Sequence, residues 1–259
     1  LGRFFQMYDH IARYYDLSHN RLTDDIPYLL ALARETEGPL LELGCGSGRL
    51  LSPLARAGFH VTGVDSSPEM LARARVRLAG EPADVRARVR LVEGDVRTLA
   101  LPDAAPFTLA FFGYNTFMHL NEVGAGTALR RVRPLLRPGG RLFIDVDNPL
   151  LLSVVADDPD FVLEDELRDE TTGETIRQFT AYESAPVEQA VDVTWVYEST
   201  GDAGRAKARL RYHYLYPHQY DLLLALTGFR LIALAGDYDG APFDEESDRL
   251  LILGVASEE

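Results

Sequence analysis

Short apolar runs alternate with segments of helical periodicity over the first 150 residues of the chain. Each run ends at a glycine or an aspartate, which is typical of the buried strands of a parallel sheet. Between two of these runs, Leu50, Leu51, Leu54 and Ala55 form an apolar stripe at helical spacing. The pattern predicts strands at 40–43, 60–65, 89–95, 107–113 and 141–147. Strands and helices in alternation produce right-handed crossovers and a parallel sheet.

Two of the connecting helices have recognisable ends. Ser67 followed by Pro68 is a typical helix start, because the serine oxygen can accept a backbone N–H and proline fits the first turn. A second helix is expected at 127–136, where Pro138 and two glycines then lead into the next strand.

The pattern changes between residues 151 and 216, where apolar and polar positions alternate with a period of two. Four runs of this kind lie at 161–167, 175–183, 190–198 and 205–216. Consecutive strands on short turns form an antiparallel sheet, so this segment is predicted to be an insertion. The α/β pattern then resumes with a helix at 217–226 and strands at 229–234 and 249–256.

The first strand leads into three glycines spaced two apart, Gly44, Gly46 and Gly48, and the next strand ends at Asp65. Glycines at a strand end remove the Cβ atoms that would keep the backbone away from a ligand. An acidic residue at the end of the neighbouring strand can hydrogen-bond ribose hydroxyls. The two features together predict a nucleoside-containing cofactor at the carboxyl ends of adjacent strands.

The glycine spacing indicates which cofactor is expected. A dinucleotide fingerprint, G-x-G-x-x-G, would need a glycine where the chain has Arg49. The alternating glycines, with Glu42 two positions upstream, instead resemble motif I of class I S-adenosylmethionine-dependent methyltransferases. A carboxylate at Glu42 suits the cationic amino-acid tail of that cofactor and is misplaced beside a pyrophosphate.

The resemblance covers residues 38–150. Within this range the segments 93–96, 107–113 and 135–140 resemble further motifs of the family, in the same order. Residues 8–16 resemble the lid helix of small-molecule N-methyltransferases of the glycine and amino-sugar type, and the antiparallel insertion is similar too. The implied fold is a Rossmann-like, seven-stranded, mostly parallel sheet of order 3-2-1-4-5-7-6, with the insertion after strand five. The implied parts are lid helices at 1–37, a cofactor-binding core at 38–150 and 217–259, and an insertion at 151–216.

By position, the resemblance implies S-adenosylmethionine as cofactor, S-adenosylhomocysteine as product, and contacts from both the core and the lid. The implied cofactor-binding residues are Glu42, Gly44, Cys45, Gly46, Gly48, Asp65, Ser66, Met70, Asp95, Val96, Phe111, Gly113, Tyr8, Tyr14 and Arg21. Within this set Asp95 and Val96 flank adenine, and Arg21 is the candidate for the carboxylate. A helix cap at Asp95 and core packing at Met70 are the structural alternatives.

Three residues are candidates for the chemistry itself. His119 follows the fourth strand and is the candidate general base, with Asn115 beside it and Tyr14 on the lid helix. Partial burial of His119 against Phe117 is the alternative reading. Aromatic residues at alternate positions of the insertion would form a substrate wall, a sheet core or the surface of a homodimer.

Charge indicates the class of acceptor. The chain has 26 Lys and Arg against 40 Asp and Glu, a formal net charge of −14. Nucleic-acid enzymes gain much of their affinity from phosphate contacts, which this balance disfavours. The Asn/Asp-Pro-Pro-Tyr/Phe motif of nucleic-acid amine methyltransferases is also missing, since residues 112–115 read Phe-Gly-Tyr-Asn. We therefore expect a small-molecule acceptor, more readily an amine nitrogen than an oxygen, and no nucleic acid.

The remaining features bound the setting of the protein. The chain has no run of 18 apolar residues and no long apolar segment at its start, so we expect no membrane span and a cytoplasmic location. A single cysteine with scattered histidines gives no zinc spacing, and no metal is expected. Two alternatives remain: a non-catalytic cofactor-binding scaffold, or a nicotinamide-dependent oxidoreductase.

Overall fold

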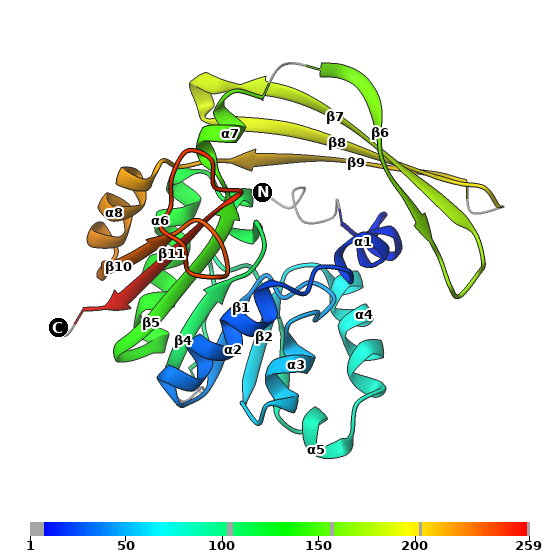
Figure 1. Ribbon diagram of the computed structural model, residues 1–259. Helices are drawn as coiled ribbons and strands as arrows, with labels where there is room; N and C mark the ends of the chain where they lie inside the picture. The colour runs from blue at the N-terminus through cyan, green and yellow to red at the C-terminus, as the bar shows by residue number, and fades with distance from the viewer. Residues whose placement is uncertain (1–7, 103–105, 156–157, 202–203, 258–259) are drawn as a thin grey trace.

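The computed structural model describes residues 8–102, 106–155, 158–201 and 204–257. Residues 1–7 of the expected lid lie outside the described part of the chain. The fold contains a seven-stranded sheet that is covered by helices on both faces. A separate four-stranded sheet arches over one end of it (Figure 1). Helix α1 (Ala12–His19) lies between the two sheets (Figure 1).

The central sheet has the order β3-β2-β1-β4-β5-β11-β10. Its strands are β1 (Leu40–Leu43), β2 (Val61–Asp65), β3 (Val89–Glu93), β4 (Phe107–Phe112), β5 (Leu136–Asp147), β10 (Phe229–Ala235) and β11 (Arg249–Ala256). The first five strands pair in parallel, and β11 runs antiparallel to both β5 and β10. The predicted fold class and strand order are confirmed.

Helices cover both faces of this sheet because its strands are apolar on both sides. Leucines of α2 (Asp25–Thr36) and α3 (Leu51–Arg56) pack in one buried cluster, and α6 (Glu122–Val132) and α8 (Pro217–Leu226) pack in the other. The remaining helices are α4 (Pro68–Ala79), α5 (Ala83–Arg86) and α7 (Pro149–Ser153), with short 3-10 turns η2 (Thr116–His119), η3 (Arg133–Leu135) and η4 (Pro186–Glu188).

The two helix predictions had different outcomes. Ser67 caps α4 as predicted, because its Oγ accepts a hydrogen bond from Met70 N at 3.1 Å. The helix expected at 127–136 is wrong in its bounds, since α6 begins five residues earlier, where Asn121 accepts a hydrogen bond from Gly124 N. A polar cap six positions upstream thus decided where this helix starts.

The insertion forms an antiparallel sheet of order β6-β7-β8-β9. Its strands are β6 (Asp158–Arg168), β7 (Thr175–Ala185), β8 (Ala190–Ser199) and β9 (Arg205–His213). The last one is shorter than predicted, because residues 214–216 lead into α8. One face of the insertion packs on α1, where the rings of Tyr197 and Tyr14 stack 5.1 Å apart. In the described residues, no helix combines the length and apolar character needed to cross a bilayer.

Candidate functional site

The loop after β1 bends sharply and depends on its glycines. Gly44, Gly46 and Gly48 have φ values of +74°, +52° and +80°, which side chains disfavour. A Cβ atom on Gly44 would lie 2.2 Å from Thr116 Cγ2, so the loop packs directly against the turn after β4. Around Gly46 the only atom of the described residues within 4 Å of an added Cβ would be Met70 Cε, at 3.8 Å. The loop therefore presents bare backbone to the space above it.

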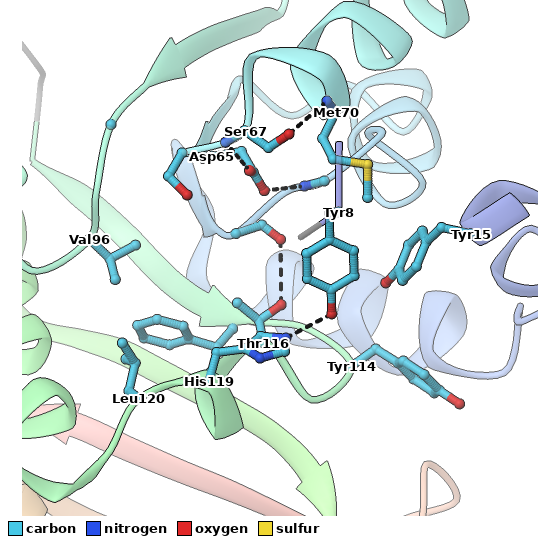
Figure 2. Close-up of a pocket in the computed structure, with 15 residues that line it drawn as sticks. Tyr8, Tyr15, Asp65, Ser67, Met70, Val96, Tyr114, Thr116, His119 and Leu120 are labelled. Atoms are coloured by element: carbon cyan, nitrogen blue, oxygen red, sulfur yellow. Dashed lines mark hydrogen bonds between the residues drawn. The ribbon is translucent and has the colours of Figure 1, made fainter. Parts of the chain in front are cut away.

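Asp65 lies at the end of β2 and holds this loop in place. Its two carboxylate oxygens accept hydrogen bonds from Gly46 N and Ser67 N, both at 2.8 Å (Figure 2). Burial raises the pKa of Asp65, while the hydrogen bonds from the backbone lower it. Each oxygen uses one of its two lone pairs in these bonds, so the carboxylate can still accept from a ligand.

Asp65 is part of the wall of a pocket of about 700 Å³, a volume that includes its opening to solvent. The part nearest the carboxyl ends of β2 and β3 is lined by Asp65, Ser66, Ser67, Met70, Gly94 and Val96. The opposite part is lined by Tyr8, Tyr15, Phe112, Tyr114, Thr116, His119 and Leu120 (Figure 2). The first part has the polar and apolar groups that an adenosine needs, and the second is mostly aromatic.

A second pocket of about 400 Å³ adjoins the first, and Gly44, Gly46 and Tyr114 line both. Glu42 lies in its wall, is 3 % exposed, and its Oε2 has no hydrogen-bond partner among the described residues. Burial raises the pKa of Glu42 well above its usual range, which nearby Arg49 opposes. A buried carboxylate oxygen without a donor fits an ammonium group of a ligand.

Tyr8 and His119 meet across the aromatic part of the first pocket. A hydrogen bond of 2.8 Å joins Tyr8 Oη and His119 Nε2, with a direction that depends on the imidazole tautomer (Figure 2). Burial lowers the pKa of His119 to about 4, and it lowers the pKa of His19, which stacks on Tyr15 at 3.6 Å, to about 4 as well. Both histidines are therefore uncharged at neutral pH.

Most of the residues predicted from the sequence lie at these two pockets. Gly44, Gly46, Asp65, Ser66, Met70, Val96, Tyr8 and His119 line the first pocket, and Glu42, Cys45 and Gly113 line the second. Gly48 lines neither of them, because it packs against α4, where its Cβ would lie 3.2 Å from Ala74 Cβ. Their roles toward a bound cofactor stay predictions.

Two of the predicted strand-end residues lie outside both pockets. Phe111 is fully buried in the core between the sheet and α3, and Phe112 lines the pocket in its place. Successive side chains of a strand point to opposite faces, so the shift by one residue reverses the side. Asp95 lines neither pocket and pairs with Arg97, whereas its neighbours Gly94 and Val96 face the cavity.

Three further predicted residues also lie outside both pockets. Tyr14 is 6 % exposed and stacks on Tyr197, so its ring joins the lid to the insertion. Arg21 is 65 % exposed in its side chain and pairs with Asp165 of β6 at 2.8 Å, outside both pockets. Asn115 is buried, and its amide donates to Asp147 Oδ2 at 2.9 Å, so it faces the protein interior.

Sequence reasoning missed several residues that line the pockets. Tyr15, Tyr114 and Thr116 line both, and Arg49 and His19 line the smaller one. Arg49 was considered only as the residue that breaks the dinucleotide pattern, yet it binds both carboxylate oxygens of buried Asp25, at 2.7 and 2.5 Å. Its position directly after the glycine loop was the available signal. Within the described residues there is no group of three His, Cys, Asp or Glu side chains that could hold a metal ion.

Replacing Asp65 by alanine is expected to weaken binding of S-adenosylhomocysteine by at least about tenfold. Hydrogen bonds to a charged group contribute roughly 1.5–3 kcal/mol each, and the change also leaves Gly46 N and Ser67 N without their partner. Isothermal titration measures the affinity. Asp95→Ala is the matched control, because it removes the same side chain from the end of β3 outside the pockets; equal losses in both variants would contradict the assignment.

Replacing His119 by glutamine is expected to make folding less sensitive to acid. The pKa of His119 is about 4 in the fold, whereas an unfolded histidine titrates near about 6.5. Between these two pKa values the unfolded state binds more protons than the folded state. The free energy of unfolding therefore falls by about 1.4 kcal/mol for each pH unit as the pH drops.

Urea unfolding over this pH range checks the difference. Between neutral pH and about pH 5, the free energy of unfolding of the wild type should fall by about 2 kcal/mol more than that of His119→Gln. His60→Gln, which changes an exposed histidine, is the control. Parallel stability curves for the wild type and His119→Gln would show that His119 is not kept neutral by burial.

Comparison with known proteins agrees with this geometry. Residues 40–140 match a family described as methyltransferase domain. A ubiquinone biosynthesis O-methyltransferase of Xylella fastidiosa (strain 9a5c) is 34 % identical over 112 residues, which cover 43 % of this chain and 43 % of that protein. The chain thus spans less than half the length of this curated relative.

Solved structures extend the likeness to the whole fold. The CcbJ methyltransferase from Streptomyces caelestis has a TM-score of 0.81 at 27 % identity, covering 97 % of this chain and 98 % of that one. The glycopeptide N-methyltransferase MtfA, solved in complex with S-adenosylmethionine, has a TM-score of 0.58 at 27 % identity over 88 % of this chain and 86 % of its own. Residues 40–140 thus match the methyltransferase domain family, and the fold of nearly the whole chain is that of these solved methyltransferases.

Proposed function

We propose that this protein is an enzyme that transfers the methyl group of S-adenosylmethionine to an amine nitrogen of a small molecule. The observation that carries the proposal is the pair of adjoining pockets. One has a carboxylate at the end of β2 and bare glycine backbone, and the other has the unpartnered oxygen of Glu42. The lid helix and the insertion close the far side with aromatic rings.

The residues present fit the cofactor. Asp65 would accept hydrogen bonds from the ribose hydroxyls, and Glu42 would accept them from the amino group of the cofactor. Gly46 leaves room for the methionine part of the cofactor between these two groups. When bound, S-adenosylmethionine supplies an electrophilic methyl group on a sulfonium. The protein contributes alignment and exclusion of water, since closure of a pocket strengthens the electrostatic interactions within it.

The aromatic part of the pocket favours a neutral nitrogen. An amine must lose its proton before it can attack, and burial among uncharged groups lowers the pKa of an amine. His119 and His19 are uncharged there at neutral pH, and His119 is hydrogen-bonded to Tyr8 rather than to a carboxylate. His119 would then hold or relay the departing proton, with Tyr8 as its hydrogen-bond partner.

The known proteins support nitrogen over oxygen by coverage. MtfA, whose name states N-methylation, aligns with 88 % of this chain. The O-methyltransferase of X. fastidiosa aligns with 43 % of the chain, a length close to that of the methyltransferase domain alone. A likeness in the acceptor pocket can be judged only from an alignment that extends beyond the methyltransferase domain, as the one with MtfA does.

The size of the acceptor follows from the lid. Arg13 of α1 binds Asp169 Oδ2 at 2.5 Å at the turn between β6 and β7, and Asp16 binds Arg73 of α4 at 2.5 Å. The helix is thus tied both to the insertion and to the core above the pocket. An acceptor that enters a pocket closed in this way is of metabolite size.

Methyl transfer to a panel of amines, phenols, RNA and intact protein tests the proposal. We expect turnover with small amines, and release of S-adenosylhomocysteine that depends on the amine. Activity on RNA or protein with the amines inert, or on phenols alone, would overturn it. Thermal stabilisation by S-adenosylhomocysteine, about 2.7 kcal/mol at a hundredfold excess, without turnover on any acceptor would favour the non-catalytic scaffold.

A homodimer through the insertion is a separate proposal. Phe161, Val162 and Leu163 of β6 are 42 %, 56 % and 47 % exposed, which is a high apolar exposure for neighbouring residues. Light scattering of the wild type and of Val162→Glu would detect a dimer and its loss. A monomer at all concentrations would exclude it.

A further inference from the structure

The turn after β4 has an unusual backbone. Tyr114 and Asn115 are consecutive and both have positive φ, +36° and +65°. Side chains other than glycine rarely adopt this conformation, and two in succession persist only where the surroundings hold them. Tyr114 lines both pockets, so the strained turn lies where the first and second pockets adjoin.

Two aspartates of β5, Asp145 and Asp147, hold this turn. Tyr114 N donates to Asp145 Oδ2 at 3.1 Å, and Asn115 N donates to the carbonyl oxygen of Asp145 at 2.9 Å. The side chain of Asn115 exchanges two hydrogen bonds with Asp147, both at 2.9 Å. The turn is thus bound to β5 through both of its residues.

Arg249 of β11 connects these groups. Its guanidinium donates to Asp145 Oδ1 at 2.9 Å from Nε, to Asp147 Oδ1 at 2.6 Å from Nη1, and to Asn115 Oδ1 at 3.1 Å from Nη2. The same group lies 4.7 Å from the centre of the Tyr114 ring, and its side chain is 10 % exposed. A planar fork that binds two carboxylates and covers a ring is a geometry that lysine does not reproduce.

A fourth side chain completes the arrangement from the segment between β10 and β11. Tyr238 Oη donates to Asp145 Oδ2 at 2.8 Å, so Asp145, fully buried, receives donors from three parts of the chain. None of Asp145, Asp147 and Arg249 lines either pocket. They reach the site only through Tyr114 and Asn115.

We propose that Arg249 is a positioning residue that, through Asp145, Asp147 and Asn115, fixes the Tyr114 ring where it contacts the bound cofactor and acceptor. This inference rests on the proposed function, because the ring matters to the reaction only if methyl transfer takes place at the junction of the two pockets. Misplacement of a contact group by about 1 Å can lower a rate by about a hundredfold.

Four variants separate positioning from simple stabilisation. Tyr114→Leu removes the ring and keeps the network. Asn115→Gly accepts the positive φ and loses only the side-chain bonds to Asp147 and Arg249. Arg249→Lys keeps the charge and loses the fork. Arg133→Lys is the matched control, because Arg133 binds Gly228 O at 2.9 Å near the end of β11, outside both pockets.

We expect kcat to fall by at least about tenfold in the first three variants, with KM for the cofactor within about threefold of the wild type in Asn115→Gly and Arg249→Lys, which keep the Tyr114 ring. Asn115→Gly should melt several degrees below the wild type, because Asp147 and Arg249 lose buried hydrogen bonds, so kcat is measured per folded molecule. Arg133→Lys should lower the melting temperature without changing kcat per folded molecule. Wild-type kcat in Tyr114→Leu or in Asn115→Gly would overturn the proposal.

Amide hydrogen exchange of residues 113–116, with and without S-adenosylhomocysteine, gives a readout that needs no turnover. Faster exchange is expected in Asn115→Gly and Arg249→Lys and not in Arg133→Lys, because Tyr114 N–H is bonded to Asp145. Exchange equal to that of the wild type would overturn the positioning role. Failure of the wild type to methylate any acceptor, with exchange still changed in the variants, would instead refute the proposed function.

Discussion

Replacing Gly46 by valine is expected to weaken binding of S-adenosylhomocysteine by up to about 150-fold while the protein stays folded. Gly46 has a φ of +52°, which costs a branched residue about 1–2 kcal/mol of backbone strain. Of the described residues, only Met70 Cε, at 3.8 Å, would meet the new Cβ, so the side chain would extend into the pocket instead of clashing with the core. Overfilling of this kind costs up to about 3 kcal/mol, or roughly 150-fold in affinity.

Gly139→Val is the matched control for this prediction. Gly139 has a φ of +70° and no atom within 4 Å of an added Cβ, so the variant has the same backbone strain in open space. Isothermal titration and thermal melting compare the two proteins. Similar melting temperatures with binding weakened only in Gly46→Val are expected. Wild-type affinity in Gly46→Val would mean that the cofactor does not lie along the glycine loop.

Removing residues 1–17 is expected to abolish methyl transfer while part of the cofactor affinity remains. The deletion takes away Tyr8 and Tyr15, which line the aromatic part of the pocket, and leaves Asp65, Glu42 and the glycine loop in place. Water then enters the pocket, and the alignment of the acceptor is lost. The loss in turnover should be at least about a hundredfold, since orientation and exclusion of water contribute several kcal/mol.

Tyr8→Phe is the milder variant for the same segment. It removes the hydroxyl that is hydrogen-bonded to His119 at 2.8 Å and keeps the ring. Loss of this single hydrogen bond should reduce kcat by about tenfold or less. Stabilisation by S-adenosylhomocysteine shows whether the shortened protein is folded. A shortened protein that binds the cofactor and turns over at the wild-type rate would contradict the role of the lid.

The cofactor half of the site could be predicted because its signals are local. A glycine with positive φ, an aspartate at a strand end and a serine before a helix each depend on a few neighbouring residues. Parallel strands bring their carboxyl ends to one edge, so the order of the elements was enough to place Gly46 and Asp65 together. The strand order, which the family resemblance implied, is confirmed.

The predicted residues that lie outside the pockets do so for a common physical reason. Both faces of the sheet are covered by helices, so Phe111 and Phe112 are equally apolar and only the tertiary structure shows which one faces the pocket. Arg21 turned to Asp165 of the insertion, a contact between residues 144 positions apart. Neither the side of the sheet that each phenylalanine faces nor the partner of Arg21 can be recognised from a periodic pattern in the sequence.

By itself, the sequence of this protein determined the parallel sheet, the antiparallel insertion and the half of the site formed by the glycine loop and Asp65. These features come from short-range patterns of apolar residues, glycines and strand-end carboxylates. Only the tertiary structure decided which side chains close the other half. Tyr8 meets His119 across 111 positions, and Arg249 binds Asn115 across 134, because the lid, the insertion and the last strand converge there after folding. Contacts between such distant segments depend on how whole elements pack, which no local pattern encodes.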